Sequence, residues 1–390
     1  MSRTSQRRPT LVPALRRLWR DTHHLQLGTD PLRAIMLELG DPRWARLLDL
    51  LDGSRTEAAL IRDAAAHGIA EPEATTLLGV LRRAGLVLDA SALIPSGLPE
   101  AVRRRLVGEA AALALRGPYP RDDQPDRGPA PGPDPRRRPG GGHHPSRRGP
   151  GHRHPAALLR RRRDAHVLVT GSSQLAVPIA AILAAAGIGH IDPDLTGVAR
   201  ASDTTPFGLL PADVHRPRGI AAAEAVRRVA PETDLSPLGR DAASFAVLVG
   251  FAAPAALTAL SYAARGLAHL AVTVRDGAVV IGPLVRPGAS PCLNCLDLHR
   301  RDRDPAWPTV AAQLTTAPDV PEPLAATTTL LGAASAAAEV IAHIDGGTPL
   351  TLGATVEIIG PGAHRRRRWG SHPGCGCLRL PGRPPAPADW

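Results

Sequence analysis

The chain has 390 residues, 43% hydrophobic and 3% aromatic, so we expect two or three domains with aliphatic cores. All 47 basic residues are arginines and the net charge is +11, but residues 118–163 alone contribute +8 through twelve Arg and four Asp. Charge gathered in one segment argues against a nucleic-acid interface, which needs a basic folded face. Met1–Thr10 lack the apolar core of a signal peptide, and no run of about 18 apolar residues suggests a membrane span. We therefore expect a cytoplasmic protein.

Residues 1–92 have the pattern of a small α+β domain. Alternating and helical spacing of the apolar residues predicts short strands, three helices and a returning strand. The expected elements are strands near Leu18, near Leu25 and over Arg33–Leu37, helices from Pro42, Ser54 and Pro72, and a strand over Leu86–Leu88. This order is typical of a winged-helix domain.

Two segments follow this domain. Residues 93–117 carry Val102, Leu106, Ala110 and Leu113 at helical spacing, which predicts a connecting helix. Residues 118–163 consist mainly of Pro, Arg, Gly and His. Such a composition cannot bury a core, so we expect a disordered linker here.

Residues 164–380 predict an α/β unit, followed by a tail over 381–390. An apolar strand over His166–Thr170 runs into a turn beginning at Gly171, then a helix, then a second strand that ends in Asp192 and Asp194. A strand, turn, helix and strand with acidic residues at its end form the opening of a Rossmann-like dinucleotide fold. Further strands and helices alternate up to about residue 360, which favours a largely parallel sheet.

The four cysteines of the chain form two short pairs. Cys292 and Cys295 make a C-x-x-C motif, and Cys375 and Cys377 make a C-x-C motif. Two such pairs supply the four thiolates of a closed, structural zinc site. Two disulfides or four unrelated thiols are the alternatives, and a reducing location favours the metal.

The first domain resembles the precursor-peptide recognition element of ribosomal-peptide biosynthesis. The resemblance lies in the sequence from Leu47 to Thr56 and in the leucine-rich helix together with the residues Arg82–Leu86 at its end. It implies that an extended leader peptide pairs with a sheet edge and contacts Leu77, Leu78, Leu81 and Arg82. A DNA-binding winged helix is the alternative, but Glu71 and Glu73 at the start of that helix would repel phosphates.

The second domain resembles the E1-like (ThiF-type) adenylyltransferases. The opening strand and turn, the Asp192–Asp194 pair, the stretch Phe207–Arg218 and the stretch Gly282–Cys292 carry the resemblance. It implies that Gly171, Asp192, Asp194 and Arg218 correspond to a nucleotide site.

That nucleotide site is degenerate by comparison with the family. Only Gly171 remains of a glycine-rich turn, Arg218 replaces a lysine, and Val249–Ala252 lacks the acidic residue expected to hold Mg²⁺. Several losses around one triphosphate predict that the chain is not an enzyme and that ATP is not its cofactor.

Together the two resemblances imply a protein of thiazole- and oxazole-modified peptide (TOMM) biosynthesis. We expect a non-catalytic scaffold that binds a precursor leader peptide, presents it to a YcaO-type cyclodehydratase and forms a homodimer. One alternative is an active E1-like adenylyltransferase acting on the C-terminus of a peptide or sulfur carrier. The other is a winged-helix DNA-binding regulator.

Overall fold

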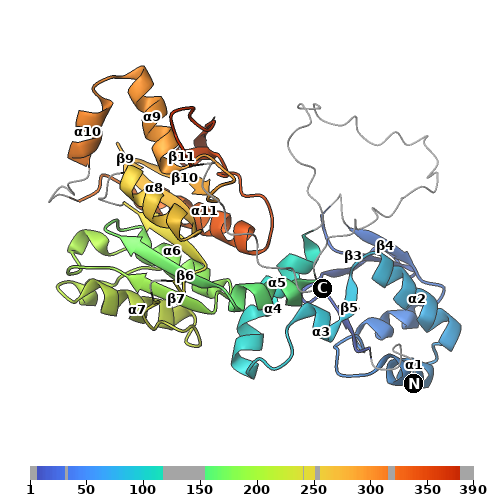
Figure 1. Cartoon of the computed structure of the whole chain (residues 1–390). Helices are drawn as coiled ribbons and strands as arrows, with labels where there is room; N and C mark the ends of the chain where they lie inside the picture. The colour runs from blue at the N-terminus through green and yellow to red at the C-terminus, as the bar shows by residue number, and fades with distance from the viewer. Residues whose placement is uncertain are drawn as a thin grey trace. The chain divides into compact units, whose positions relative to one another are not determined.

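A computed structural model of the chain describes residues 7–30, 34–116, 154–239, 241–250, 255–314 and 321–377. The chain divides into two compact units, Met1–Arg160 and Arg161–Trp390 (Figure 1). The predicted tail 381–390 and the linker up to residue 153 lie outside the described residues.

The first unit contains two small antiparallel sheets and several helices. One sheet pairs β1 with β5, and the other has the order β2-β3-β4. The strands are β1 (Pro9–Leu11), β2 (Arg17–Trp19), β3 (His24–Leu27), β4 (Ile35–Glu38) and β5 (Val87–Asp89). The helices are the 3-10 helix η2 (Pro42–Leu48) and the α-helices α1 (Glu57–Ala66), α2 (Glu71–Arg83), α3 (Ala90–Leu93) and α4 (Glu100–Leu115).

Helix α1 shows how local sequence positions these elements. The hydroxyl of Thr56 accepts a hydrogen bond from the Ala59 N–H at 3.3 Å, so Thr56, not Ser54, is the N-cap. The apolar faces of α1 and α2 then meet Leu25, Leu27 and Leu47 in one buried core. The α+β character of this unit is confirmed, while its winged-helix assignment stays a prediction.

Helix α5 (Pro155–Arg163) lies in the segment that we expected to be a disordered linker. Leu159 is buried against Leu113. Arg162 is fully buried, and its guanidinium pairs with Asp345 at 2.6 Å. The overall composition of residues 118–163 therefore did not indicate that the end of this segment forms a helix, packs and makes an ion pair.

The second unit is built on a seven-stranded sheet with the order β12-β11-β10-β9-β8-β6-β7. Strands β6 to β9 are parallel, and β10 to β12 add antiparallel pairs. The strands are β6 (His166–Gly171), β7 (His190–Asp194), β8 (Phe245–Val249), β9 (Ala268–Arg275), β10 (Ala278–Val285), β11 (Ala354–Gly360) and β12 (Ala363–Arg368). The mixed α/β fold with a large, mostly parallel sheet is the predicted Rossmann-like class.

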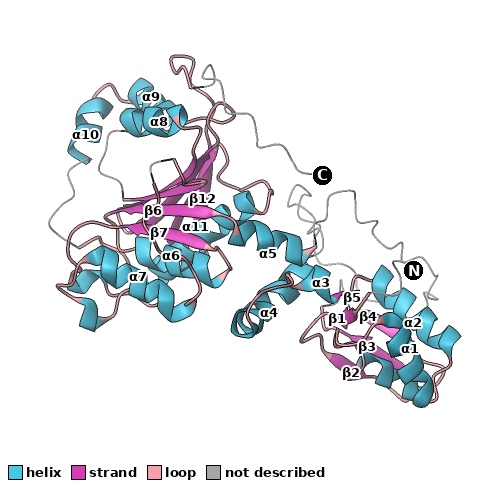
Figure 2. Cartoon of the chain, turned by 60° about the horizontal axis from the view of Figure 1, so that its bottom comes forward, coloured by secondary structure: helices cyan, strands magenta, loops and turns pink. Residues whose placement is uncertain are grey.

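Helices cover both faces of this sheet (Figure 2). Helices α6, α7 and α11 pack together on one face, while α8 and α9 lie together on the other. The helices are α6 (Ala176–Ala185), α7 (Arg218–Val229), α8 (Ala255–Ala264), α9 (Leu293–Arg303), α10 (Trp307–Leu314) and α11 (Ala326–Ile344), with 3-10 turns η3 (Ala201–Asp203) and η4 (Pro211–Asp213).

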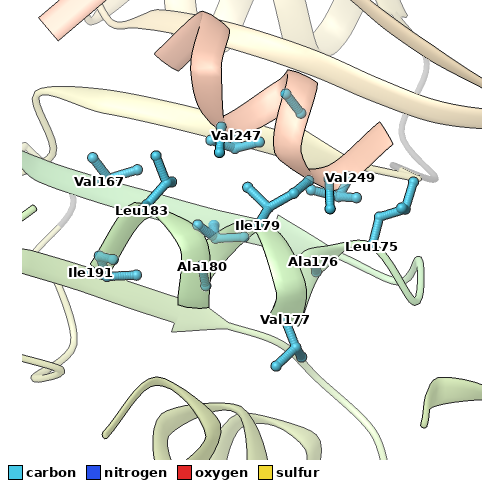
Figure 3. Close-up of a cluster of buried hydrophobic side chains, with 14 of the residues drawn as sticks. Val167, Leu175, Ala176, Val177, Ile179, Ala180, Leu183, Ile191, Val247 and Val249 are labelled. Carbon is cyan, nitrogen blue, oxygen red and sulfur yellow. The ribbon is translucent and has the colours of Figure 1, made fainter. Parts of the chain in front are cut away.

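The main core lies between the sheet and helices α6 and α11. Ile179 and Leu183 of α6 pack against Val167 of β6 and Val247 of β8 (Figure 3). Helix α11 is long and apolar enough to cross a membrane by length and composition. It nevertheless buries Ala333, Ala336, Ala337 and Val340 in this core, as a core helix of a globular unit does.

Candidate functional site

The turn after β6 places the candidate nucleotide site at the carboxyl ends of β6, β7 and β8. Gly171 has φ +129°, and a Cβ there would lie 1.9 Å from the Val249 carbonyl oxygen, so only glycine fits. The N–H groups of Ser172 and Ser173 donate to that same carbonyl at 3.0 and 3.4 Å. These two amides hold the turn against β8 and are not free for a ligand.

Arg218 supports the turn from inside the protein. Its guanidinium donates to the carbonyl oxygens of Ser172 and Ser173 at 2.8 and 3.0 Å. Its Nε lies 3.4 Å from Asp203, and the side chain is buried. The structure therefore gives Arg218 a positioning role in the turn, where the resemblance implied a contact with the nucleotide.

Asp192 and Asp194 lie on β7 beside the same turn. The register of β6 and β7 pairs Leu168 with Asp192 and Thr170 with Asp194. Asp192 is buried and accepts a hydrogen bond from the Leu238 N–H at 2.7 Å. Burial, with a smaller contribution from Asp194, raises the pKa of Asp192. Asp194 is exposed, so its carboxylate can reach a ligand.

Glu322 was not predicted from the sequence, and its carboxylate lies at this site. Its Oε2 accepts hydrogen bonds from the Ser173 hydroxyl at 2.6 Å and from the Gln174 N–H at 3.2 Å. These donors stand at the amino end of α6, where the helix dipole favours an anion. A carboxylate from the segment before α11 thus occupies the position of the turn best suited to a phosphate.

The four cysteines converge although two of them lie far along the chain. Neighbouring sulfurs lie 3.9 Å (Cys292–Cys295), 3.7 Å (Cys292–Cys375) and 3.4 Å (Cys295–Cys377) apart, and all four lie within 4.8 Å of one another. Zinc with ligands at about 2.3 Å would place tetrahedral sulfurs about 3.8 Å apart. A disulfide needs about 2.05 Å, so the spacing fits a four-thiolate metal site.

The surroundings of the cysteines affect the ionisation of the thiols and the order of the second pair. Burial, then the neighbouring sulfurs, raises the pKa of Cys292, and burial raises that of Cys377 to about 11. A cation among the sulfurs would reverse this by stabilising thiolates. Asn294 donates to the Cys375 sulfur at 3.4 Å, and His372 binds Asp302 at 2.7 Å while accepting from the Gly374 N–H at 3.0 Å. These contacts order the second cysteine pair.

The residues predicted to bind the leader peptide lie in the first unit. Leu77, Leu78 and Leu81 are buried in its core. The guanidinium of Arg82 makes two hydrogen bonds to Glu57, both at 2.8 Å. These side chains stabilise the unit itself, and their contact with a peptide stays a prediction. Helical spacing alone does not distinguish a core face from a binding face.

Comparison with known proteins supports the fold. No protein-family model matches the chain, and no curated protein matches it by sequence. Solved structures do: E. coli MccB with ATP is 14% identical with a TM-score of 0.58, covering 95% of this chain and 99% of MccB. Microcin C7 biosynthetic enzyme MccB with N-formylated MccA is 13% identical with a TM-score of 0.58 over the same shares. PaaA is 14% identical with a TM-score of 0.53, covering 76% of this chain and 92% of PaaA.

These similarities correct two predictions. The prediction that the chain is not an enzyme is contradicted, because the structures that share its fold include a biosynthetic enzyme and complexes with ATP and AMPCPP. The expectation that ATP is not bound finds no support. The prediction had counted the missing glycines, the lysine and the acidic residue in Val249–Ala252. It did not consider the Ser173 hydroxyl and the Gln174 N–H at the amino end of α6, which hold the carboxylate of Glu322.

Proposed function

We propose that this chain is an E1-like, ATP-dependent adenylyltransferase that activates the carboxylate of a ribosomally made peptide. The similarity to MccB over 95% of this chain, which spans both units, is the observation that supports it. A carboxylate oxygen of the peptide would attack the α-phosphorus of ATP. The bond between the α-phosphorus and the oxygen that bridges to the β-phosphate would break. Pyrophosphate would depart, and the peptide would become an acyl adenylate.

The residues at the end of β6 have distinct roles in this proposal. Ser173 and Gln174 donate hydrogen bonds to a phosphate once Glu322 has moved away, and Asp194 accepts hydrogen bonds from ribose hydroxyls. Gly171 and Arg218 hold the shape of the turn. Zinc bound by Cys292, Cys295, Cys375 and Cys377 is structural, because four protein ligands leave no open position.

The first unit, in this proposal, binds the precursor peptide as a winged-helix recognition element. MccB was solved with the peptide MccA, which supports a peptide partner. A YcaO-type cyclodehydratase partner, a homodimer and a cytoplasmic location stay predictions, which co-purification, sedimentation and cell fractionation would test.

Peptide-dependent exchange of labelled pyrophosphate into ATP tests the activity. The candidate peptides are those encoded by any short open reading frames found beside the gene. We expect exchange with a peptide that has a free C-terminal carboxylate and none with the same peptide as its C-terminal amide. The proposal fails if the full chain neither binds ATP in calorimetry nor catalyses exchange with any of these peptides.

A further inference from the structure

Strand β12 is a fully exposed and strongly basic edge of the large sheet. All six of its residues are exposed, and four consecutive arginines occupy positions 365–368. It pairs with β11 on one side, and within the described part of the chain no strand pairs with its other side. That side therefore presents backbone N–H and C=O groups that another strand could use.

Alternation along β12 places two arginines on each face. Arg365 and Arg367 line a cleft with Arg275, Arg300 and the Trp369 ring. Arg366 is directed elsewhere and donates to the Leu350 carbonyl at 2.9 Å. The cleft face of β12 is thus continuous with further positive charge that β9 and α9 supply.

The positive charge of the cleft exceeds what nearby carboxylates neutralise. Glu357 accepts from both Arg275, at 2.7 Å, and Arg365, and Arg300 lies 3.3 Å from Asp297. Arg367 lies 5.5 Å from the centre of the Trp369 ring and has no carboxylate within ion-pair distance among the described residues. Burial lowers the pKa of Arg300, and Arg275 and Arg367 lower it further by repulsion. An anion in this cleft would relieve that repulsion.

We propose that β12 is a docking edge for an extended acidic peptide segment with carboxylates at alternate positions. Such a segment would add a strand beyond β12, and its residues i and i+2 would face Arg365 and Arg367, about 7 Å apart along the strand. A nucleic acid can neutralise arginines and accept hydrogen bonds from N–H groups, but it does not offer the alternating N–H and C=O groups that pair with a strand edge. This recognition is separate from the proposed adenylation and does not depend on it.

Two fluorescent peptides of equal composition test the proposal with the full chain. One alternates Glu and Thr over eight residues, and the other has the order Glu-Glu-Thr-Thr repeated twice. We expect at least fivefold tighter binding of the alternating peptide by anisotropy. N-methylation of every second peptide bond on its pairing edge should abolish the difference, because it removes the N–H donors that β12 requires.

Two matched double variants test the role of the arginines. Arg365→Gln with Arg367→Gln should weaken binding of the alternating peptide at least tenfold, whereas Arg366→Gln with Arg368→Gln should weaken it less than threefold. Arg367→Gln alone, which breaks no ion pair, provides the same test if the first pair unfolds. The proposal would be overturned if both double variants lost the same affinity for the alternating peptide and the wild type bound duplex DNA of matched charge as tightly as the peptide. That result would show general polyanion binding. Absence of peptide binding would overturn it as well.

Discussion

At the residue scale, Glu322 connects the fold to the proposed chemistry. Its carboxylate uses the hydroxyl of Ser173 and the N–H of Gln174, the donors that a phosphate of ATP would need. Two anions cannot share these donors, so under the proposed function a nucleotide would have to displace the Glu322 side chain. Removing the carboxylate should then change the affinity for ATP.

We therefore predict that Glu322→Gln raises the affinity for ATP about tenfold. Hydrogen bonds to a charged group contribute about 1.5–3 kcal/mol, and the amide competes more weakly for the same donors. Calorimetric titration of ATP measures the effect. Glu232→Gln, which removes the same charge from an exposed position of the second unit, should leave the affinity unchanged. If Glu322→Gln and the wild type bound ATP with equal affinity, Glu322 would not compete with the nucleotide for these donors.

His269 is a second residue that we expect to affect a measurable property, the pH dependence of stability. It is buried, and its Nδ1 lies 3.0 Å from the Leu267 carbonyl, while burial lowers its pKa to about 4. The unfolded value is about 6.5, so between pH 6.5 and 4 the unfolded chain binds more protons. The stability that depends on neutral His269 is then fully present above pH 6.5, and it is lost as the pH falls through this window.

We predict that His269→Phe keeps the packing against Tyr262 but removes this pH dependence. Between pH 7 and 5 the wild type should lose about 2 kcal/mol more free energy of unfolding than the variant, since 1.36 kcal/mol corresponds to one pKa unit. Urea denaturation at both pH values gives the comparison. Parallel losses in the two proteins would show that another group carries the acid sensitivity.

At the scale of elements, the cysteine cluster joins α9 to the segment after β12. Cys295 lies on α9, and Cys375 and Cys377 follow Trp369, so a metal held by them would link the two ends of the antiparallel half of the unit. Loss of the metal should loosen this half before the parallel strands, because the main core between β6, β8 and α6 does not include the cysteines.

Cys295→Ser should therefore lower both zinc content and thermal stability. Structural zinc contributes about 10–16 kcal/mol in small domains, and each kcal/mol shifts Tm by about 2–4 °C in a unit of this size. We expect less than half of the wild-type zinc by atomic absorption and a fall in Tm of more than about 8 °C. Asn294→Ala, which removes a hydrogen bond and no ligand, should retain stoichiometric zinc. A serine variant with full zinc and unchanged Tm would exclude the site.

At the scale of the whole molecule, each unit has its own hydrophobic core. We predict that residues 1–160 and residues 161–390 fold when they are expressed separately, with zinc bound by the second fragment. Peptide-dependent pyrophosphate exchange should fall at least tenfold when the fragments are mixed at micromolar concentration, because the covalent connection supplies a much higher effective concentration. Full exchange by the second fragment alone would show that the first unit does not deliver the peptide.

The sequence alone determined the α/β class, most elements of the second unit and the four cysteines that cluster. These features follow from the local sequence: apolar periodicity, a turn that begins at Gly171 and two short cysteine pairs. The burial of Leu77, Leu78 and Leu81 in the core and the position of Arg218 beneath the turn depend on the tertiary structure. It also brought Glu322 to Gln174 across 148 residues of chain and formed β12 from a run of arginines without apolar alternation. Such contacts depend on which distant segments pack together, and the spacing of residues along the chain does not record that.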